Sequence, residues 1–141
     1  MNTLSNKFFR AALVFFGVGI GLGVFMSVSQ DFTIRPVHVH VNLLGWVCFF
    51  LYGAFYRFFP EAAQTKLAAS HFWSAVVGMP PMMIGLGLVL YGYEMPGVPL
   101  LLAGELLSVV SVALFMVVGF RATAGAATTA RHPAQPVATR E

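Results

Sequence analysis

Charged side chains are scarce in this 141-residue chain, because only 9% of its residues are charged while 58% are hydrophobic. Soluble domains carry roughly 25% charged residues, and a soluble core of this size cannot bury so much apolar surface. The composition therefore excludes an ordinary soluble domain. The basic residues form no patch with interleaved aromatic side chains, so nothing indicates a nucleic acid as a partner.

Cysteine is also nearly absent. The single Cys48 cannot form an intrachain disulfide, and neither a cysteine pair nor a carboxylate cluster indicates a structural zinc site. A pair of adjacent histidines is missing too. The residues left for chemistry are a few histidines and one isolated carboxylate inside apolar sequence.

Long apolar runs are abundant. Four stretches are almost free of charge, at residues 11–29, 37–58, 71–92 and 98–120, and each is near the ~20 residues that a helix needs to span a bilayer. We therefore predict an all-α integral membrane four-helix bundle. Its transmembrane domain covers residues 1–120, and the small, polar, proline-containing segment 121–141 is expected to be a disordered cytoplasmic tail.

The placement of basic residues predicts the orientation. Lys7 and Arg10 precede the first span, Arg57 and Lys66 lie between the second and the third, and Arg121 follows the fourth. Basic residues favour the cytoplasmic side. The N- and C-termini are therefore expected to be cytoplasmic, in a bacterial-type inner (cytoplasmic) membrane.

Two features predict how the spans pack. The first span contains "GVGIGLG", and small residues spaced by four allow helix backbones to approach closely in lipid. The third span contains Pro80 and Pro81, which should bend it near its middle.

Two histidines stand two residues apart at the start of the second span, in "RPVHVHVNLLGWV" at residues 35–47. A helix turns about 100° per residue, so His38 and His40 point roughly 200° apart and cannot hold one metal ion together. If both are ligands, they serve two centres on opposite flanks of the helix. Otherwise, water and lipid headgroups satisfy them at the membrane interface.

The surroundings of this pair favour a flat cofactor. Asn42 and Gly45 follow His38 on its side of the helix, where Gly45 would leave room for a macrocycle. Imidazole without a cysteine pair or a carboxylate cluster suits haem iron. We therefore predict haem b, with His38 and His40 as axial ligands and with Arg35 as a partner for a haem propionate.

His71 and Glu105 are two further candidates for a metal site. From His40 to Phe58 the second span rises by roughly 27 Å, so His71, at the opposite end, cannot share a haem with either outer histidine of its own chain. It is either a metal ligand at that end or an interfacial residue at a helix start. Glu105 lies about two turns inside the fourth span, a depth at which a carboxylate is usually functional or paired. It could accept a hydrogen bond from a histidine, transfer protons, or be protonated and buried between helices.

Counting ligands predicts a homo-oligomer. Neither outer histidine finds an axial partner within its own chain, so a haem with two histidine ligands requires a second protomer. This expectation follows from the positions of His38, His40 and His71 along the spans.

A longer stretch, "SQDFTIRPVHVHVNLLGWVCFFLYGAFYRFFPE" followed by "LAASHFWSAVVGM", resembles the catalytic subunit of the haem-copper oxidase superfamily, most closely the C-type oxidases. In those subunits an H-x-H pair at a helix start gives its first histidine to the high-spin haem and its second to the low-spin haem. A Gly-Trp follows, then a proline at the cytoplasmic end, then a helix opening with His-Phe-Trp. The matching positions here are His38, His40, Gly45, Trp46, Pro60, His71, Phe72 and Trp73.

The resemblance implies a membrane b-type haem protein that acts in electron transfer or reacts with a small gas, oxygen or nitric oxide. The oxidases arrange twelve helices as three arcs of four, so one four-helix arc implies a homotrimer. If the chain is an enzyme, it is an oxidoreductase of the haem-copper oxidase type, with a redox protein or a quinol as its partner. The additional histidines of the oxidase copper centre are missing here, so the resemblance does not extend to that centre.

Two alternatives stay open at this point. The chain could be a copper-binding or copper-handling membrane protein without haem, in which an oligomer gathers His38, Glu105 and the methionines of "MPPMM" around copper. It could also be a non-catalytic assembly partner of an oxidase.

Overall fold

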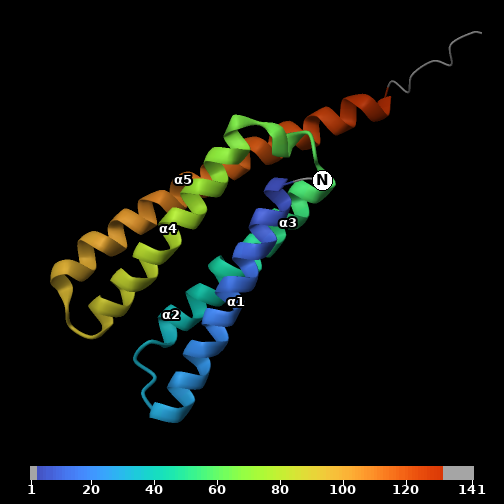
Figure 1. Cartoon of the computed structure of the whole chain (residues 1–141). Coiled ribbons are helices and arrows are strands. Elements are labelled where there is room, and N and C mark those ends of the chain that lie inside the picture. Colours follow the sequence, from blue (N-terminus) through green and yellow to red (C-terminus); the bar gives the residue numbers. More distant parts are fainter. Residues whose placement is uncertain (1–2, 132–141) are drawn as a thin grey trace, which may run out of the picture.

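Long helices running side by side make up the fold in the computed structural model, which describes residues 3–131 (Figure 1). The elements are α1 (Thr3–Ser29), α2 (Arg35–His40), the π-helix η1 (Val41–Cys48), α3 (Phe49–Phe58), the 3₁₀ turn η2 (Ala62–Gln64), α4 (Lys66–Leu90) and α5 (Glu94–Arg131). α2, η1 and α3 follow one another without a break and form a single long helix. Within the described residues, four helices are thus long and apolar enough to cross a membrane.

The prediction of an all-α, four-helix, multi-pass membrane protein is therefore confirmed. Helix α5 continues beyond residue 120 as far as Arg131, so it includes the first part of the segment expected to be a tail. Residues 132–141 of that segment lie outside the described residues.

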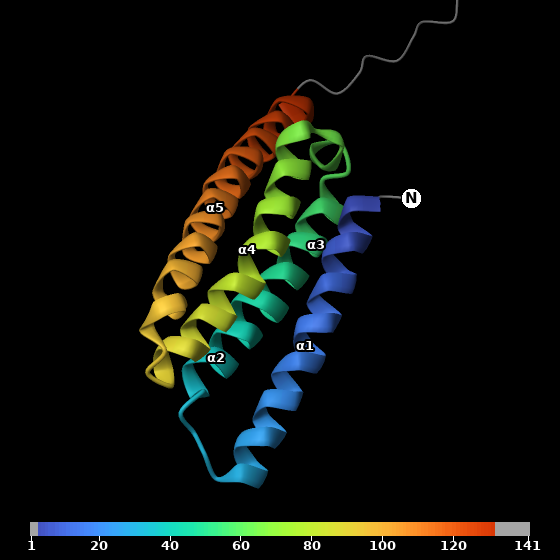
Figure 2. The ribbon, with the colours of Figure 1, turned by 60° about the vertical axis from the view of Figure 1, so that its left-hand side comes forward.

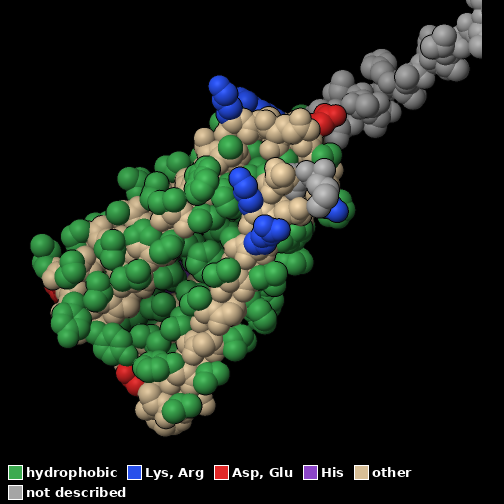
Figure 3. Space-filling view, viewed as in Figure 1, with side chains coloured by type: hydrophobic (Ala, Val, Ile, Leu, Met, Phe, Trp, Pro, Cys, Tyr) green, Lys and Arg blue, Asp and Glu red, His purple; other side chains and the backbone are tan. Residues whose placement is uncertain are grey.

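The bundle consists of two helical hairpins. α1 packs against the continuous helix α2–η1–α3, and α4 packs against α5 (Figures 1 and 2). The start of α1, the connection from α3 to α4 and the far end of α5 lie at the same end of the bundle. Figure 3 shows Lys and Arg side chains gathered at this end, which we call the basic end, while hydrophobic side chains cover most of the rest of that face.

Glycines allow the second hairpin to pack closely. A Cβ atom on Gly85 would clash with the backbone of Leu101, and a Cβ atom on Gly104 would clash with Met82. Backbones in lipid approach this closely only where small residues line the contact. The sequence predicts such packing for the first span, and the glycines of α4 and α5 provide it in the second hairpin as well.

The second long helix contains an unexpected π-helical segment, η1, where the sequence had predicted a continuous helix over residues 37–58. Buried residues recur here at every fourth position, namely Val37, Val41, Gly45, Phe49 and Gly53. In an α-helix each step of four residues drifts by about 40° around the axis. The wider i→i+5 turn offsets part of that drift, so the five positions stay turned toward the core.

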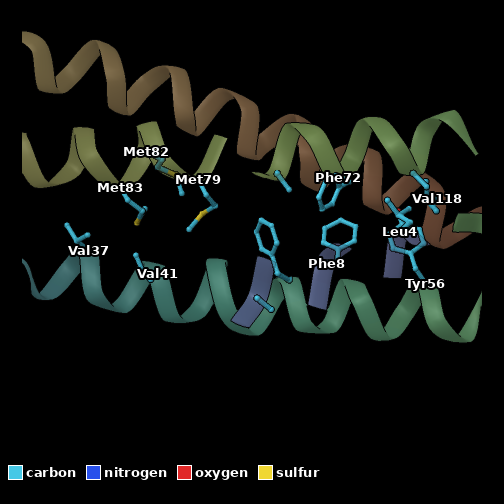
Figure 4. Packing of buried hydrophobic residues seen from close by; sticks show 14 of the residues in the cluster. Leu4, Phe8, Val37, Val41, Tyr56, Phe72, Met79, Met82, Met83 and Val118 are labelled. Atoms are coloured by element: carbon cyan, nitrogen blue, oxygen red, sulfur yellow. The ribbon is translucent and has the colours of Figure 1, made fainter. Parts of the chain in front are cut away.

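The core changes in character along the bundle (Figure 4). Met79, Met82 and Met83 lie with the valines of α2 and η1 in the half away from the basic end, whereas aromatic rings, with Phe8 at their centre, fill the other half. α4 continues through Pro80 and Pro81 as one helix and changes direction near its middle (Figure 2). The methionines of "MPPMM" thus pack between helices and fill an irregular space, a role that suits their flexible side chains.

A hydrogen bond ties the two connections at the outer end, opposite the basic end. Asp31, between α1 and α2, accepts a hydrogen bond from the Tyr91 hydroxyl at 2.8 Å and another from the backbone N–H of Thr33 at 2.9 Å. The hydrogen bonds from Thr33 and then from Tyr91 lower the pKa of Asp31 below its ordinary value. The same bond raises the pKa of Tyr91. The tie is therefore strongest when Asp31 is ionised and Tyr91 is protonated.

Candidate functional site

His40 lies on the outside of α2 with one ring nitrogen already used. The helix starts at Arg35 with Pro36 in its first turn, where a missing N–H costs no helical hydrogen bond. The His40 ring is exposed, and its Nδ1–H donates to the Pro36 carbonyl at 2.7 Å. Because a carbonyl can only accept, Nδ1 carries a proton, and the neutral form of this imidazole keeps its lone pair on Nε2. Metal-bound histidines are commonly oriented by this kind of bond to a backbone carbonyl.

His38 lies against α1. Its ring is half-buried, and its Nδ1–H donates to the Gly19 carbonyl at 3.0 Å. A Cβ atom on Gly23 would lie 3.2 Å from Cε1 of the ring, and a Cβ atom on Gly19 would lie 2.6 Å from the Asn42 amide. The glycines of "GVGIGLG" therefore accommodate polar side chains of the neighbouring helix. His38 and His40 thus lie on different faces of α2, as helical geometry requires.

The two faces differ in which side chains cover the helix below each histidine. On the His38 side, the room expected over Gly45 is occupied, because a Cβ atom there would lie 2.7 Å from Cγ of Phe15 in α1. Trp46 packs against Phe16, with ring centroids 4.4 Å apart. The space expected over Gly45 is therefore filled by Phe15 of the same chain.

The His40 side is open and apolar. Leu44, Val47 and Leu51 are exposed along the helix below it, and a planar hydrophobic cofactor can lie against such a face. Arg35 is exposed at the start of the same helix, where its guanidinium stacks over the Phe32 ring at 5.4 Å. The residues present fit a haem at His40.

Glu105 is exposed on α5, in contrast to the burial between helices considered as one alternative. Val112, two turns farther along α5 and on the same face, lines a small cavity of about 40 Å³ together with Leu44. Leu44 in turn follows His40 by four residues. The residues that line this cavity come from η1, α3, α4 and α5, and neither Glu105 nor His40 is among them.

His71 occupies a different place from the interfacial one considered from the sequence. Its ring is fully buried, its Nδ1 lies 2.9 Å from the Tyr56 hydroxyl, and its Nε2 is buried without a hydrogen-bond partner among the described residues. The rings of Phe8, Tyr52 and Phe115 surround it, with centroids 4.5 to 5.2 Å from that of His71. The histidine is thus part of the aromatic core.

Sequence reasoning missed Tyr56 as the partner of His71. Tyr56 lies three residues before the connection that begins at Phe59, and His71 lies six residues after that connection ends at Thr65. Two side chains placed in this way at the same end of adjacent antiparallel helices are expected to be neighbours. This spacing was the signal that could have found the pair.

The candidate residues do not converge on one metal site. Within residues 3–131, no group of three or more His, Cys, Asp and Glu side chains is placed to hold a metal ion. His38 faces α1, His40 faces outward, and His71 lies in the core toward the basic end.

Comparison of the chain with protein-family models, with curated proteins and with solved structures finds no match. The likeness to the haem-copper oxidases rests on the motifs quoted above.

Proposed function

We propose that this chain is a membrane b-type haem protein that holds its haem through Nε2 of His40. The observation that carries the proposal is the state of that imidazole. It lies on an exposed apolar helix face with Nδ1–H fixed by the Pro36 carbonyl, and haem iron accepts this type of ligand. A haem there would supply a one-electron redox centre, and an open axial position would bind a small gas such as oxygen or nitric oxide.

The second axial ligand would come from outside the chain. His38 lies on a different face of α2 and His71 lies toward the opposite end, so neither supplies it. A second copy of the chain is the proposed source, and a homotrimer would rebuild the three arcs of the oxidases that the sequence resembles. In this arrangement His38 positions α2 against α1, a narrower role than the axial ligand predicted from the sequence.

Glu105 has a place in the same proposal. Its side chain is exposed on α5, and we assign to its carboxylate the exchange of protons with the haem site. Under this proposal, Glu105→Gln keeps the haem but removes part of the pH dependence of its midpoint potential.

We further propose that the basic end faces the cytoplasm of a bacterial-type inner membrane. Lys and Arg gather at this end (Figure 3), and basic residues are retained on the cytoplasmic side. The haem would then lie near the outer face of the membrane. A redox protein or a quinol would be its electron partner, and any catalytic turnover would be that of an oxidoreductase.

An absorption spectrum of the detergent-purified protein tests the proposal. Bound haem gives a Soret band and, after reduction, an α-band. His40→Ala should abolish both bands, whereas the matched His38→Ala should retain them and lower stability, because it removes the contacts with Gly19 and Asn42 and leaves His40 in place. A colourless, folded parent protein, or equal haem loss in the two variants, contradicts the assignment. Adding carbon monoxide then distinguishes gas binding from electron transfer. A shift of the haem bands indicates an open axial position, and no shift indicates two protein ligands.

The copper alternative finds less support. Met79, Met82 and Met83 are buried between helices, and Ser108 donates a hydrogen bond to the Met82 sulfur at 3.7 Å. These sulfur atoms are therefore part of the core packing. Elemental analysis of the same purified protein distinguishes the two proposals. Bound copper without haem favours the copper alternative, and bound iron with a Soret band favours haem.

A further inference from the structure

A large cavity lies at the basic end, far from His40. It has a volume of about 520 Å³ and lies between the segment that connects α3 to α4 and the α5 helix. Four hydrophobic side chains form much of its wall, namely Phe58, Phe59, Leu67 and Val118, and two charged side chains, Glu61 and Arg121, also line it. Cavities of about 300 to 1,000 Å³ are typical of small-molecule sites.

The two charges are the unusual part of this cavity. Both side chains are exposed, and neither forms an ion pair with any residue whose side chain the structure describes. Opposite charges that line one cavity without pairing can each take the complementary group of a ligand. Arginine matches the geometry of a phosphate, to which it donates paired hydrogen bonds. A carboxylate accepts hydrogen bonds from an ammonium group.

The position of the cavity in the membrane narrows the ligand class. Arg121 is the first charged residue after the long apolar part of α5, and Glu61 follows the end of α3 by three residues. Both charges therefore lie at the level where lipid headgroups meet the hydrocarbon core. The apolar wall below them suits the glycerol backbone and the first part of the acyl chains.

We propose that this cavity binds a phospholipid whose headgroup carries a phosphate and a primary ammonium, as in phosphatidylethanolamine. Arg121 binds the phosphate, Glu61 accepts hydrogen bonds from the ammonium, and the phenylalanines contact the acyl chains. A headgroup without a cation leaves Glu61 unpaired beside a phosphate, and a choline headgroup has no N–H to donate. The selectivity thus comes from Glu61, and the affinity for any phosphate comes from Arg121. The site is independent of the haem.

Native mass spectrometry of the full-length protein tests this inference. The protein is placed in nanodiscs with equal amounts of phosphatidylethanolamine, phosphatidylglycerol and phosphatidylcholine, and the lipids that stay bound after release are counted. The parent protein should retain phosphatidylethanolamine preferentially. Arg121→Gln should lower retention of all three lipids, by about tenfold for phosphatidylethanolamine. Glu61→Gln should keep phosphate binding and lose the preference for the ethanolamine headgroup.

Two matched variants control for charge alone. Arg57→Gln and Glu94→Gln remove exposed charges that do not line the cavity, and both should leave lipid retention unchanged. Circular dichroism melting of each variant shows that it is folded. The inference is overturned if the parent retains the three lipids equally, or if Arg57→Gln lowers retention as much as Arg121→Gln does. Because this readout needs no haem, its failure leaves the haem proposal standing, and the reverse also holds.

Discussion

Replacing Tyr56 with phenylalanine tests how the buried histidine contributes to stability. The Tyr56 hydroxyl lies 2.9 Å from Nδ1 of His71, whose Nε2 already lacks a partner among the described residues. Hydrogen bonds between transmembrane helices average about 0.6 kcal/mol. A buried polar atom left without a partner costs about 1–3 kcal/mol. Tyr56→Phe should therefore lower the free energy of unfolding by about 1–3 kcal/mol.

His71→Phe should behave differently. It removes both ring nitrogens, including the one without a partner, and places a phenyl ring among the rings of Phe8, Tyr52 and Phe115. Replacing both members of a polar pair with apolar groups of similar shape can be nearly neutral. The double variant should therefore be less destabilised than the sum of the two single variants, with a coupling of about 1 kcal/mol or more.

Unfolding in mixed micelles of increasing SDS content, followed by circular dichroism, measures these free energies. Tyr52→Phe is the matched control, because it keeps the ring contact with His71 and removes a hydroxyl that forms no hydrogen bond to that histidine. It should change stability by less than about 0.5 kcal/mol. The reasoning is refuted if the two single effects simply add, or if His71→Phe costs more than Tyr56→Phe.

Two further predictions concern helix packing and the outer connections. Gly85→Ala should destabilise the α4–α5 hairpin by about 1–3 kcal/mol, because the added Cβ atom meets the backbone of Leu101. Gly17→Ala is the control and should not destabilise the fold, because nothing lies within 4 Å of its Cβ position. SDS titration measures both free energies of unfolding, and equal losses of stability contradict the close approach of α4 and α5. The hydrogen bond between Asp31 and Tyr91 should protect the amides of the outer connections from hydrogen exchange at pH values above the ordinary carboxyl pKa. This protection should weaken as the pH falls through the lowered pKa of Asp31, below 3.8. It should also weaken as alkaline pH passes the raised pKa of Tyr91. Hydrogen exchange of the loop amides against pH measures this, and Asp31→Asn should remove the acid limb of the profile.

The sequence predicted the helices well because their signal is local. Each apolar run is long enough to span a bilayer on its own, and its ends are marked by charge or by turn residues such as Gly92, which adopts a positive φ of 83°. The different faces of His38 and His40 also follow from local geometry, since both lie in the regular turns of α2.

The parts that were missed depend on other segments of the chain. The missing side chain of Gly45 predicted free space beside the helix, but Phe15, thirty residues earlier, fills that space. The burial of His71 depends on Phe8 in α1 and on Phe115 in α5, and nothing near His71 in the sequence identifies these neighbours. The π-helix could have been noticed from its fourfold spacing of small and apolar residues, but a single sequence does not show which side of a helix is covered.

The π-helix also sets the rotation of one end of the second long helix relative to the other. The outer end presents His40 to the surroundings, while the inner end holds Tyr56 inside the core. Deleting one residue between positions 41 and 48 would leave the hydrophobic character of the helix unchanged but would rotate one end relative to the other by about 100°. The direction in which the outer imidazole points is therefore set by the number of residues in this segment. A change of length alone, without any new side chain, would redirect this outer surface, and it would also turn Val37 out of the core.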